Sequence, residues 1–221
     1  MKTRSLTLAH LAIASMTSCI AVLAPAVASA QDTANASTDG NTDLRWLVRA
    51  RVLRLDPANH DTTGLDLSIN GKTIPDVDLS YFFTPQWAAE LVLTVPQKQH
   101  IRAGGEGIGS LRHLPPTLTL QYHFAGLGAL KPYVGAGVNY TRFSGVRFSP
   151  AVEAALQPGI EKSSVGAALQ AGIDYDLGRN LVLNFDIKKL QIRTDVRSAG
   201  ARIGELKVDP WLIGVGLGWR F

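Results

Sequence analysis

The chain has 221 residues, a formal net charge of +4 and an apolar fraction of 46%. This small and scattered charge excludes a nucleic-acid-binding protein of the usual kind, because those proteins concentrate Lys and Arg on one surface. After residue 30, no stretch approaches the ~18 consecutive apolar residues of a membrane-spanning helix, so helical membrane segments are excluded there as well.

Residues 1–30 are predicted to be a secretory signal peptide. Lys2 and Arg4 form a short positive region, an apolar run extends from Leu6 to Val27, and Ala28-Ser29-Ala30 offers a small-residue cleavage site. An N-terminal membrane anchor is the alternative, although several Ser and Thr residues within the run argue against it. On this interpretation the mature protein has about 190 residues, enough for one domain.

Cysteine chemistry is not expected in the mature chain. Cys19 is the only cysteine of the sequence and lies within the predicted signal peptide. Disulfides and Cys-based metal sites are therefore not expected, nor is a cofactor. Residues 31–43 are small and polar, which predicts a flexible segment ahead of the first strand.

Residues 44–221 contain eight segments in which apolar and polar residues alternate, the pattern of a strand with two different faces. In chain order they are residues 44–55, 77–84, 87–95, 117–124, 132–143, 164–177, 181 to about 193, and about 204–221. The alternation of the seventh segment degrades after Lys188, where we expect the chain to rise above the membrane or to form a bulge.

The apolar face of these segments is predicted to meet lipid. In the last segment the apolar stripe starts at Trp211 and finishes with Trp219 and Phe221, and aromatic residues collect at the two interfaces of a bilayer. The other face carries charges of both signs, which suit an enclosed interior better than lipid. A soluble eight-stranded ligand-binding barrel is the alternative, but its apolar face would point inward.

Short and long connections alternate along the chain. Segments two and three, four and five, and six and seven are joined by short turns, whereas the other links are long: residues 56–76, 96–116, 144–163 and 194–203. This asymmetry is typical of outer-membrane barrels. The sequence therefore predicts an all-β protein, an eight-stranded antiparallel transmembrane β-barrel in a Gram-negative outer membrane, with both termini periplasmic. In the third long link, residues 150–157 are expected to form a short helix that begins at a proline and covers the barrel rim.

Four motifs stand out: HLPPT at residues 113–117, QYHF at 121–124, KPYVGAGVNYT at 131–141 and GWRF at 218–221. In order and spacing they resemble the signature of the OmpW family, and the resemblance extends over the mature chain. It implies an eight-stranded outer-membrane barrel that the barrel assembly machinery inserts and that passes small hydrophobic molecules. Some members of the family serve the uptake of alkanes or aromatic compounds.

The interior of an eight-stranded barrel is only just wide enough for side chains, which excludes a water-filled porin. Inward polar residues predict an ion-paired plug in the periplasmic part of the lumen: Arg45, Arg49, Arg51, Glu90, Gln121, His123, Asp174 and Arg220. Inward apolar residues predict a funnel that is open to the outside and closed below: Leu53, Leu55, Val92, Phe143, Leu190 and Ile192.

The predicted plug and funnel lead to a transport hypothesis. An apolar solute would enter from the outer loops, meet the plug and leave sideways through the wall into the outer-membrane lipid. Removal of apolar area from water, worth about 25 cal/mol per Å², would drive this transfer without hydrolysis or an ion gradient. Lys188, beside Lys189, stands where relatives place a large aromatic residue at the funnel floor. Lys188 is therefore a candidate gate, and the solute could carry a polar or anionic head.

Three alternatives stay open. The inward residues could simply fill a non-conducting structural barrel, or the outer loops could serve as a receptor for a phage, a bacteriocin or a host surface. A lipid-modifying enzyme would need a catalytic group at the rim. His60, Asp61, His100, Ser110 and His113 fall in the long links, but no spacing among them marks a triad or a metal site. The sequence therefore predicts no enzyme activity.

Overall fold

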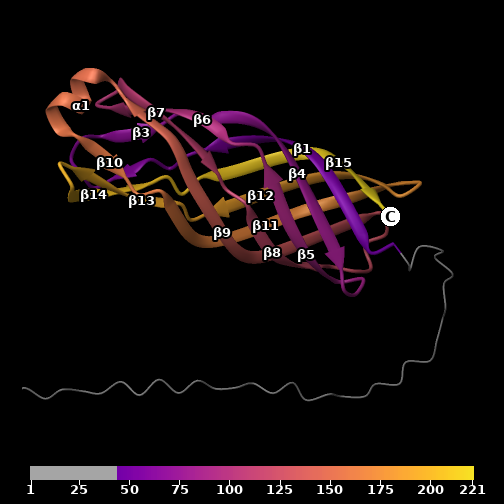
Figure 1. Ribbon diagram of the computed structural model, residues 1–221. Coiled ribbons are helices and arrows are strands. Elements are labelled where there is room, and N and C mark those ends of the chain that lie inside the picture. Colours follow the sequence, from indigo (N-terminus) through magenta and orange to yellow (C-terminus); the bar gives the residue numbers. More distant parts are fainter. Residues whose placement is uncertain (1–43) are drawn as a thin grey trace, which may run out of the picture. The chain divides into compact units, whose positions relative to one another are not determined.

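The computed structural model describes residues 44–221; the expected signal peptide and the segment 31–43 lie outside the described residues. Eight strands form a closed antiparallel barrel (Figure 1). They are β1 (Trp46–Asp56), β4 (Lys72–Phe82), β5 (Trp87–Thr94), β8 (Thr117–His123), β9 (Leu130–Phe148), β11 (Ser163–Gly178), β12 (Leu181–Leu190) and β15 (Trp211–Arg220). Each pairs with the next in this order, and β15 pairs with β1, so the predicted fold class is confirmed.

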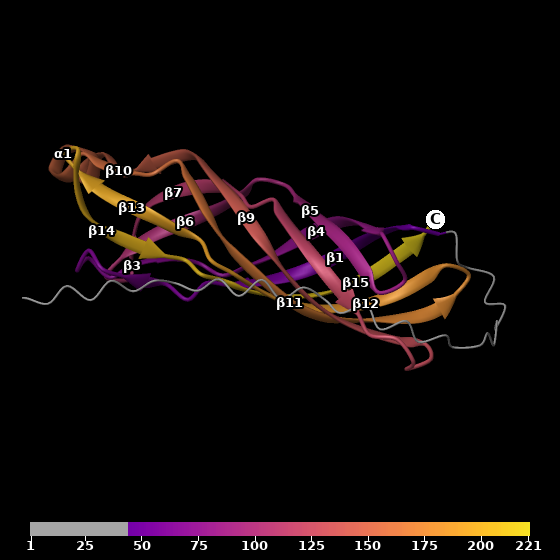
Figure 2. The ribbon, with the colours of Figure 1, turned by 90° about the horizontal axis from the view of Figure 1, so that it is seen from below.

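The short connections lie at one end of the barrel, which we call the turn end. They consist of residues 83–86, 124–129 and 179–180. Arg179 and Asn180 both have positive φ, 52° and 65°, the geometry of a two-residue turn whose twist matches that of its strands. The C-terminus lies at the same end (Figures 1 and 2).

The long links are more ordered than the sequence pattern indicates, and we call the structure that they build the extension. Its elements are β2 (His60–Asp61), β3 (Leu67–Ile69), β6 (Gln97–Ala103), β7 (Glu106–Leu114), α1 (Pro150–Leu156), β10 (Pro158–Ile160), β13 (Arg193–Ser198) and β14 (Ala201–Lys207). Strands β7, β6 and β3 continue the main sheet beside β9, while β10, β13, β14 and β2 form a second sheet. Figures 1 and 2 show the extension opposite the turn end.

Four expected boundaries differ from the structure by three or more residues. Strand β9 ends at Phe148 rather than at residue 143. Strand β4 begins at Lys72 rather than at residue 77, and β12 ends at Leu190 rather than near residue 193. Residues 204–207 belong to β14 in the second sheet, not to the last barrel strand. The expected short helix is confirmed as α1, with Pro150 in its first turn. Within residues 44–221, no helix is long and apolar enough to span a membrane.

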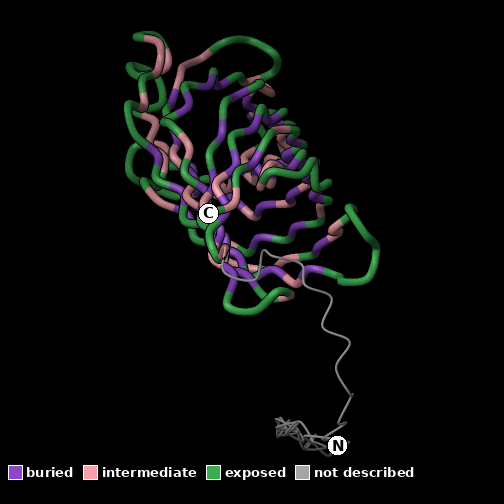
Figure 3. Tube along the Cα trace, turned by 90° about the vertical axis from the view of Figure 1, so that its right-hand side faces the viewer, coloured by how far each residue is buried: buried purple, intermediate pink, exposed green. Residues whose placement is uncertain are grey.

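The outer surface of the barrel is apolar, as predicted. Figure 3, seen from the turn end, shows buried and exposed residues alternating along the barrel strands. Aromatic rings contact one another in two rows near the turn end, Trp46–Tyr81–Phe83 and Trp87–Tyr122–Phe124, with ring centroids 4.8–5.3 Å apart. Tyr140 and Trp211 are exposed nearer the extension. Such aromatic girdles flank the lipid-facing band of outer-membrane barrels.

Spin labels should test this orientation. Leu169 and Val215 are 60% and 52% exposed on the outer wall, so nitroxides at these positions in a bilayer are expected to be accessible to oxygen and shielded from a water-soluble nickel complex. A label at Arg102, exposed on β6 of the extension, serves as the water-accessible control. Water contact at both wall positions would contradict a lipid-facing apolar surface.

Candidate functional site

A cluster of buried charges crosses the barrel interior, and we call it the ionic plug. Its members are Arg49, Arg51, Asp76, Asp78, Glu90, Asp174, Asp186 and Lys188. All are inward residues of barrel strands and all are buried. Strand alternation sends every second side chain into the lumen. The eight residues come from five strands, β1, β4, β5, β11 and β12, and meet in one layer.

Arg49 is the centre of the plug on the side of the turn end. Its Nε and Nη2 donate to the two carboxylate oxygens of Asp174 at 3.2 and 2.8 Å. Its Nη1 donates to Asp78 at 2.9 Å and to Glu90 at 3.3 Å, and also to the hydroxyl of Ser80. This fork-to-carboxylate geometry is the strongest form of ion pair that a side chain makes.

Arg51 and Lys188 hold the opposite side of the plug. Arg51 donates to Oδ2 of Asp76 through Nε and Nη2, at 3.1 and 2.7 Å, and its Nη2 lies 2.9 Å from Asp78. The Lys188 ammonium lies 3.0 Å from Asp186 and 3.1 Å from Glu90. The candidate gate residue is therefore an ion-paired member of the plug.

Negative charge exceeds positive charge in the plug. Its three cations give +3 and its five carboxylates give −5, a formal balance of −2 within the described residues. Neutral side chains extend the network without changing that balance. Gln170 donates to Glu90 and Asp186, while Asn184 donates to Asp174 and to the Tyr133 hydroxyl.

Small residues on β15 make room for the plug. Gly216 lies opposite Arg51 on β1, and a methyl group at this position would approach Arg51 Cγ to 2.7 Å and collide with the backbone of Ala50. At the neighbouring inward position, Gly218, a methyl group would approach the side chains of Val182, Arg49 and Leu47 to 2.8–2.9 Å. The strand that leads into the GWRF motif therefore carries small residues where the narrow lumen leaves no room for larger ones.

The structure brings together six of the eight residues that the sequence predicts for a polar plug. Arg49, Arg51, Glu90 and Asp174 belong to the ionic plug, while Gln121 donates to Glu90 at 2.9 Å and contacts His123. The other two lie outside it. Arg45 is exposed at the turn end and donates to Tyr81, and Arg220 is half-buried, with its guanidinium over the ring of Phe82 at 4.6 Å.

Below the plug, the lumen opens at the turn end. A vestibule of about 400 Å³ is lined by the mouth residues Arg45, Lys131, Asp176 and Arg220 together with aromatic side chains. An apolar layer of Leu47, Phe82, Ala88 and Val182 separates it from the plug. The barrel therefore combines an open mouth at this end with a closed middle.

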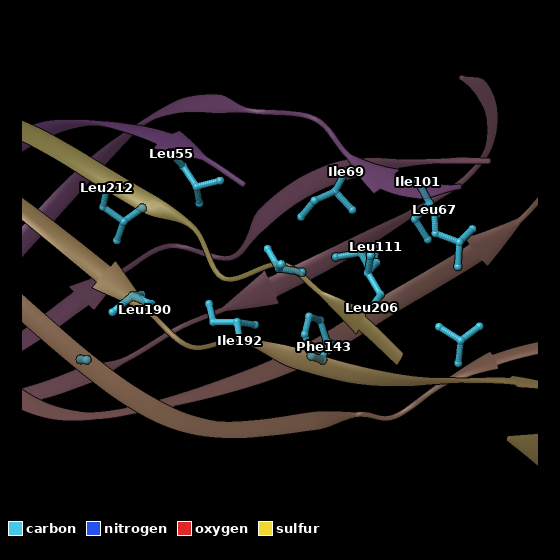
Figure 4. Packing of buried hydrophobic residues seen from close by; sticks show 13 residues of the cluster. Leu55, Leu67, Ile69, Ile101, Leu111, Phe143, Leu190, Ile192, Leu206 and Leu212 are labelled. Carbon is cyan, nitrogen blue, oxygen red and sulfur yellow. The ribbon is translucent and has the colours of Figure 1, made fainter. Parts of the chain in front are cut away.

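Above the plug, apolar side chains fill the lumen and the extension. The cluster comprises Leu55, Leu67, Ile69, Ile101, Leu111, Phe143, Ala168, Leu190, Ile192, Val196, Leu206, Val208 and Leu212. Figure 4 shows these side chains pointing toward one another along the interior, from Leu55, Leu190 and Leu212 on β1, β12 and β15 to Leu67 and Ile101 in the extension. The six residues predicted for a funnel are all buried on this side of the plug.

Two cavities mark the ends of the apolar interior. The floor cavity, about 20 Å³, is lined by five predicted funnel residues and by Asp76 and Lys188 of the plug. The tip cavity, about 40 Å³, lies beneath α1 and is lined by side chains that include Val152, Leu156 and Phe148.

His113, buried in the extension, stays uncharged near neutral pH, because burial and the nearby charge of Lys72 lower its pKa to about 4.

The wall has a break in strand pairing next to the floor cavity, and we call it the wall gap. Strands β5 and β8 pair as far as Val92 and Thr117, and β6 and β7 resume pairing at Gln97 and His113. Between them, residues 93–96 and 114–116 make no ladder with each other, and three of these residues are prolines without an N–H. Thr94 and Pro115, within the gap, line the floor cavity.

The model of the OmpW family matches residues 46–221, a range that includes the whole barrel and its extension. The chain belongs to the OmpW family. It is accordingly an outer-membrane protein that associates with outer-membrane lipid, as the recognised motifs predict.

Individual OmpW relatives cover most of the chain. The uncharacterized outer-membrane protein y4mB of Sinorhizobium fredii is 41% identical, over 80% of each chain. A dibenzothiophene metabolism operon protein, PahQ of Pseudomonas aeruginosa, is 30% identical over 65% of this chain and 69% of PahQ. Among solved structures, OprG of Pseudomonas aeruginosa superimposes with a TM-score of 0.73 and 25% identity, covering 80% of this chain and 96% of OprG.

Sequence reasoning did not assign Asp76, Asp78 and Asp186 to the plug, although they supply three of its five carboxylates. Asp78 and Asp186 occupy inward positions of their strands, so alternation alone could have included them. Asp76 follows Pro75, and a proline argues against a strand interior. In the structure, Pro75 lies opposite Val52 of β1 but beyond the last pair that β4 forms with β5, Asp76 and Thr94, so no ladder with β5 is interrupted there.

Proposed function

We propose that this protein passes small hydrophobic molecules into the outer membrane, through the apolar interior of the extension and out sideways above the ionic plug. The extension would face the outside and the turn end, with both termini, the periplasm. The observation that carries this proposal is the continuous apolar cluster that leads from the tip cavity to the floor cavity and stops at buried charges.

The apolar cluster supplies the favourable environment. A solute that leaves water for this interior gains about 25 cal/mol for each Å² of apolar surface removed from water. The cavities are small in this structure, so passage requires the aliphatic side chains of the cluster to shift as the solute advances. Helix α1 has no buried residue, so few contacts oppose its displacement from the tip cavity.

The ionic plug favours a sideways exit over a straight passage. An apolar solute offers no replacement for the hydrogen bonds among eight buried charged groups, and separating buried ion pairs is costly. The wall gap lies at the level of the floor cavity. The residues on its two sides form no backbone ladder with each other, so a passing solute has no such hydrogen bonds to break. Leu93 and Val95 face outward there, so a solute that passes the gap meets apolar surroundings throughout.

PahQ supports the solute class through its name, which links it to dibenzothiophene metabolism, since dibenzothiophene is an apolar aromatic molecule. A non-conducting barrel and a surface receptor are the competing functions, and both predict no effect on solute entry. We also propose that the chain is not an enzyme, since its loop histidines and Ser110 form no constellation that the sequence marks as catalytic.

Uptake by whole cells tests the transport proposal. Cells that express the protein are expected to take up labelled n-octane or dibenzothiophene several-fold faster than cells with an empty vector, because the outer leaflet slows apolar solutes. Cells that express an unrelated eight-stranded barrel at the same level are the control for membrane disturbance. Equal rates in all three strains would remove the transport function and leave the structural or receptor function.

A further inference from the structure

We propose that the floor cavity is a recognition site for a hydrogen-bond-donating head group, a hydroxyl or an ammonium, at the end of an apolar chain. This inference deepens the proposed function and rests on it for the origin of the solute. It names Asp76 as the residue that selects the head group.

The first observation is an acceptor without a partner. Asp76 is 2% exposed and lines the floor cavity. Its Oδ2 accepts both hydrogen bonds from Arg51, at 3.1 and 2.7 Å, whereas its Oδ1 has no hydrogen-bond partner among the described residues. Buried polar atoms in proteins nearly always have partners, so this one calls for an explanation.

The other polar groups of the floor cavity are already engaged. Lys188 is paired with Glu90 and Asp186. The Thr117 hydroxyl donates to the Pro115 carbonyl and accepts from the Asn139 amide. The Thr94 hydroxyl donates to the Pro75 carbonyl at 3.5 Å. Among the described residues, Asp76 Oδ1 is therefore the one buried side-chain atom of the cavity lining without a hydrogen-bond partner, and a carboxylate oxygen accepts and does not donate.

Size and charge agree with this assignment. The floor cavity of about 20 Å³ has room for about one water-sized group, which suits a hydroxyl or an ammonium and leaves the alkyl chain among the leucines above. The formal balance of −2 in the plug favours a donor or a cation over a carboxylate. An anionic head, which the two lysines at residues 188 and 189 suggested, is thereby disfavoured.

A set of eight-carbon probes separates the possible head groups. The probes are n-octylamine, which only donates at neutral pH; 2-octanone, which only accepts; 1-octanol, which does both; and n-octane, which does neither. Binding to the ¹⁵N-labelled protein in micelles is followed through the amide signals of Thr117, Lys188 and Leu190. We expect 1-octanol and n-octylamine to bind about tenfold more tightly than 2-octanone or n-octane.

The variant Asp76→Asn is expected to reverse this order. Arg51 has only donors, so the amide oxygen must turn toward Arg51 and the amide nitrogen then points into the cavity. The floor becomes a donor, and 2-octanone should bind more tightly than n-octylamine. The matched control is Asp174→Asn, which removes the same charge from the plug at a residue that does not line the floor cavity; it should keep the order of the unchanged protein.

Three results would overturn the inference: no shifts at the floor with any probe, equal affinities for n-octylamine and 2-octanone, or the same change of order in Asp174→Asn as in Asp76→Asn. The comparison of the four probes uses the unchanged protein, so it does not depend on whether either variant folds. Failure of uptake with head-group selectivity intact would remove the transport function alone, and uptake without selectivity would remove this inference alone.

Discussion

Replacement of Arg49 by Met is expected to lower the free energy of unfolding by about 3–5 kcal/mol, because it leaves buried carboxylates without their counter-charge. Asp174 would lose both of its guanidinium hydrogen bonds and Asp78 one of its two ion pairs. The methionine fills much of the vacated volume, so the effect reports the charge rather than a cavity.

Urea unfolding of the protein in micelles or lipid vesicles, followed by tryptophan fluorescence, measures this difference. Arg202→Met is the control, because Arg202 pairs with Asp195 at a similar distance, 2.8 Å, but at an exposed position; a change of about 0–1 kcal/mol is expected there. A loss below about 1 kcal/mol for Arg49→Met would mean that the plug contributes little to folding. It would also weaken the argument that the plug prevents a straight passage of the solute.

The stability of this plug depends on features that the sequence specifies unequally. Alternation determines which face a residue occupies, and for Arg49, Glu90 and Asp174 this was enough to place them inside. Alternation does not determine how far along the barrel axis two inward residues stand from each other. Arg45 and Arg220 share the inward parity, yet they lie at the open mouth rather than in the plug.

Height along the axis follows from the register of all strands, which only the closed sheet defines. Lys188 shows the consequence. Its nearest acidic residue in sequence is the inward Asp186. Its second partner, Glu90, lies 98 residues earlier, and the two meet only because four strand pairings around the barrel set them at one level. The sequence therefore indicated an inward lysine without its ion pairs.

The extension was harder to predict for a similar reason. Its second sheet joins four short strands from three separate regions of the chain: β2, β10, and the hairpin of β13 and β14, none longer than seven residues. Strands this short contain too few positions for a clear alternation, and their stability comes from packing on the apolar cluster rather than from local propensity. The barrel strands, with apolar residues on lipid and polar ones inside, carried the stronger signal.

Closing the wall gap with a disulfide is expected to abolish uptake of n-octane while leaving the barrel folded. Val92 pairs with Thr117, so continuing that register by one residue sets Leu93 opposite Pro116 at the edge of the gap. A Leu93→Cys/Pro116→Cys variant should form this bond in the oxidising periplasm. If solutes leave through the gap, uptake should fall to the rate of cells with an empty vector, and a reductant should restore it.

The control disulfide differs only in its place along the same two strands. Leu91 and Leu118 also face outward and are already paired in the ladder, so Leu91→Cys/Leu118→Cys staples strands that do not separate. Its uptake should match that of the unmodified protein in both redox states. Unchanged uptake by the oxidised gap variant would exclude exit at this place, because no solute can pass between strands that a covalent bond holds together. Transport through the barrel would then need a route past the ionic plug, and variants of Arg49 should change its rate.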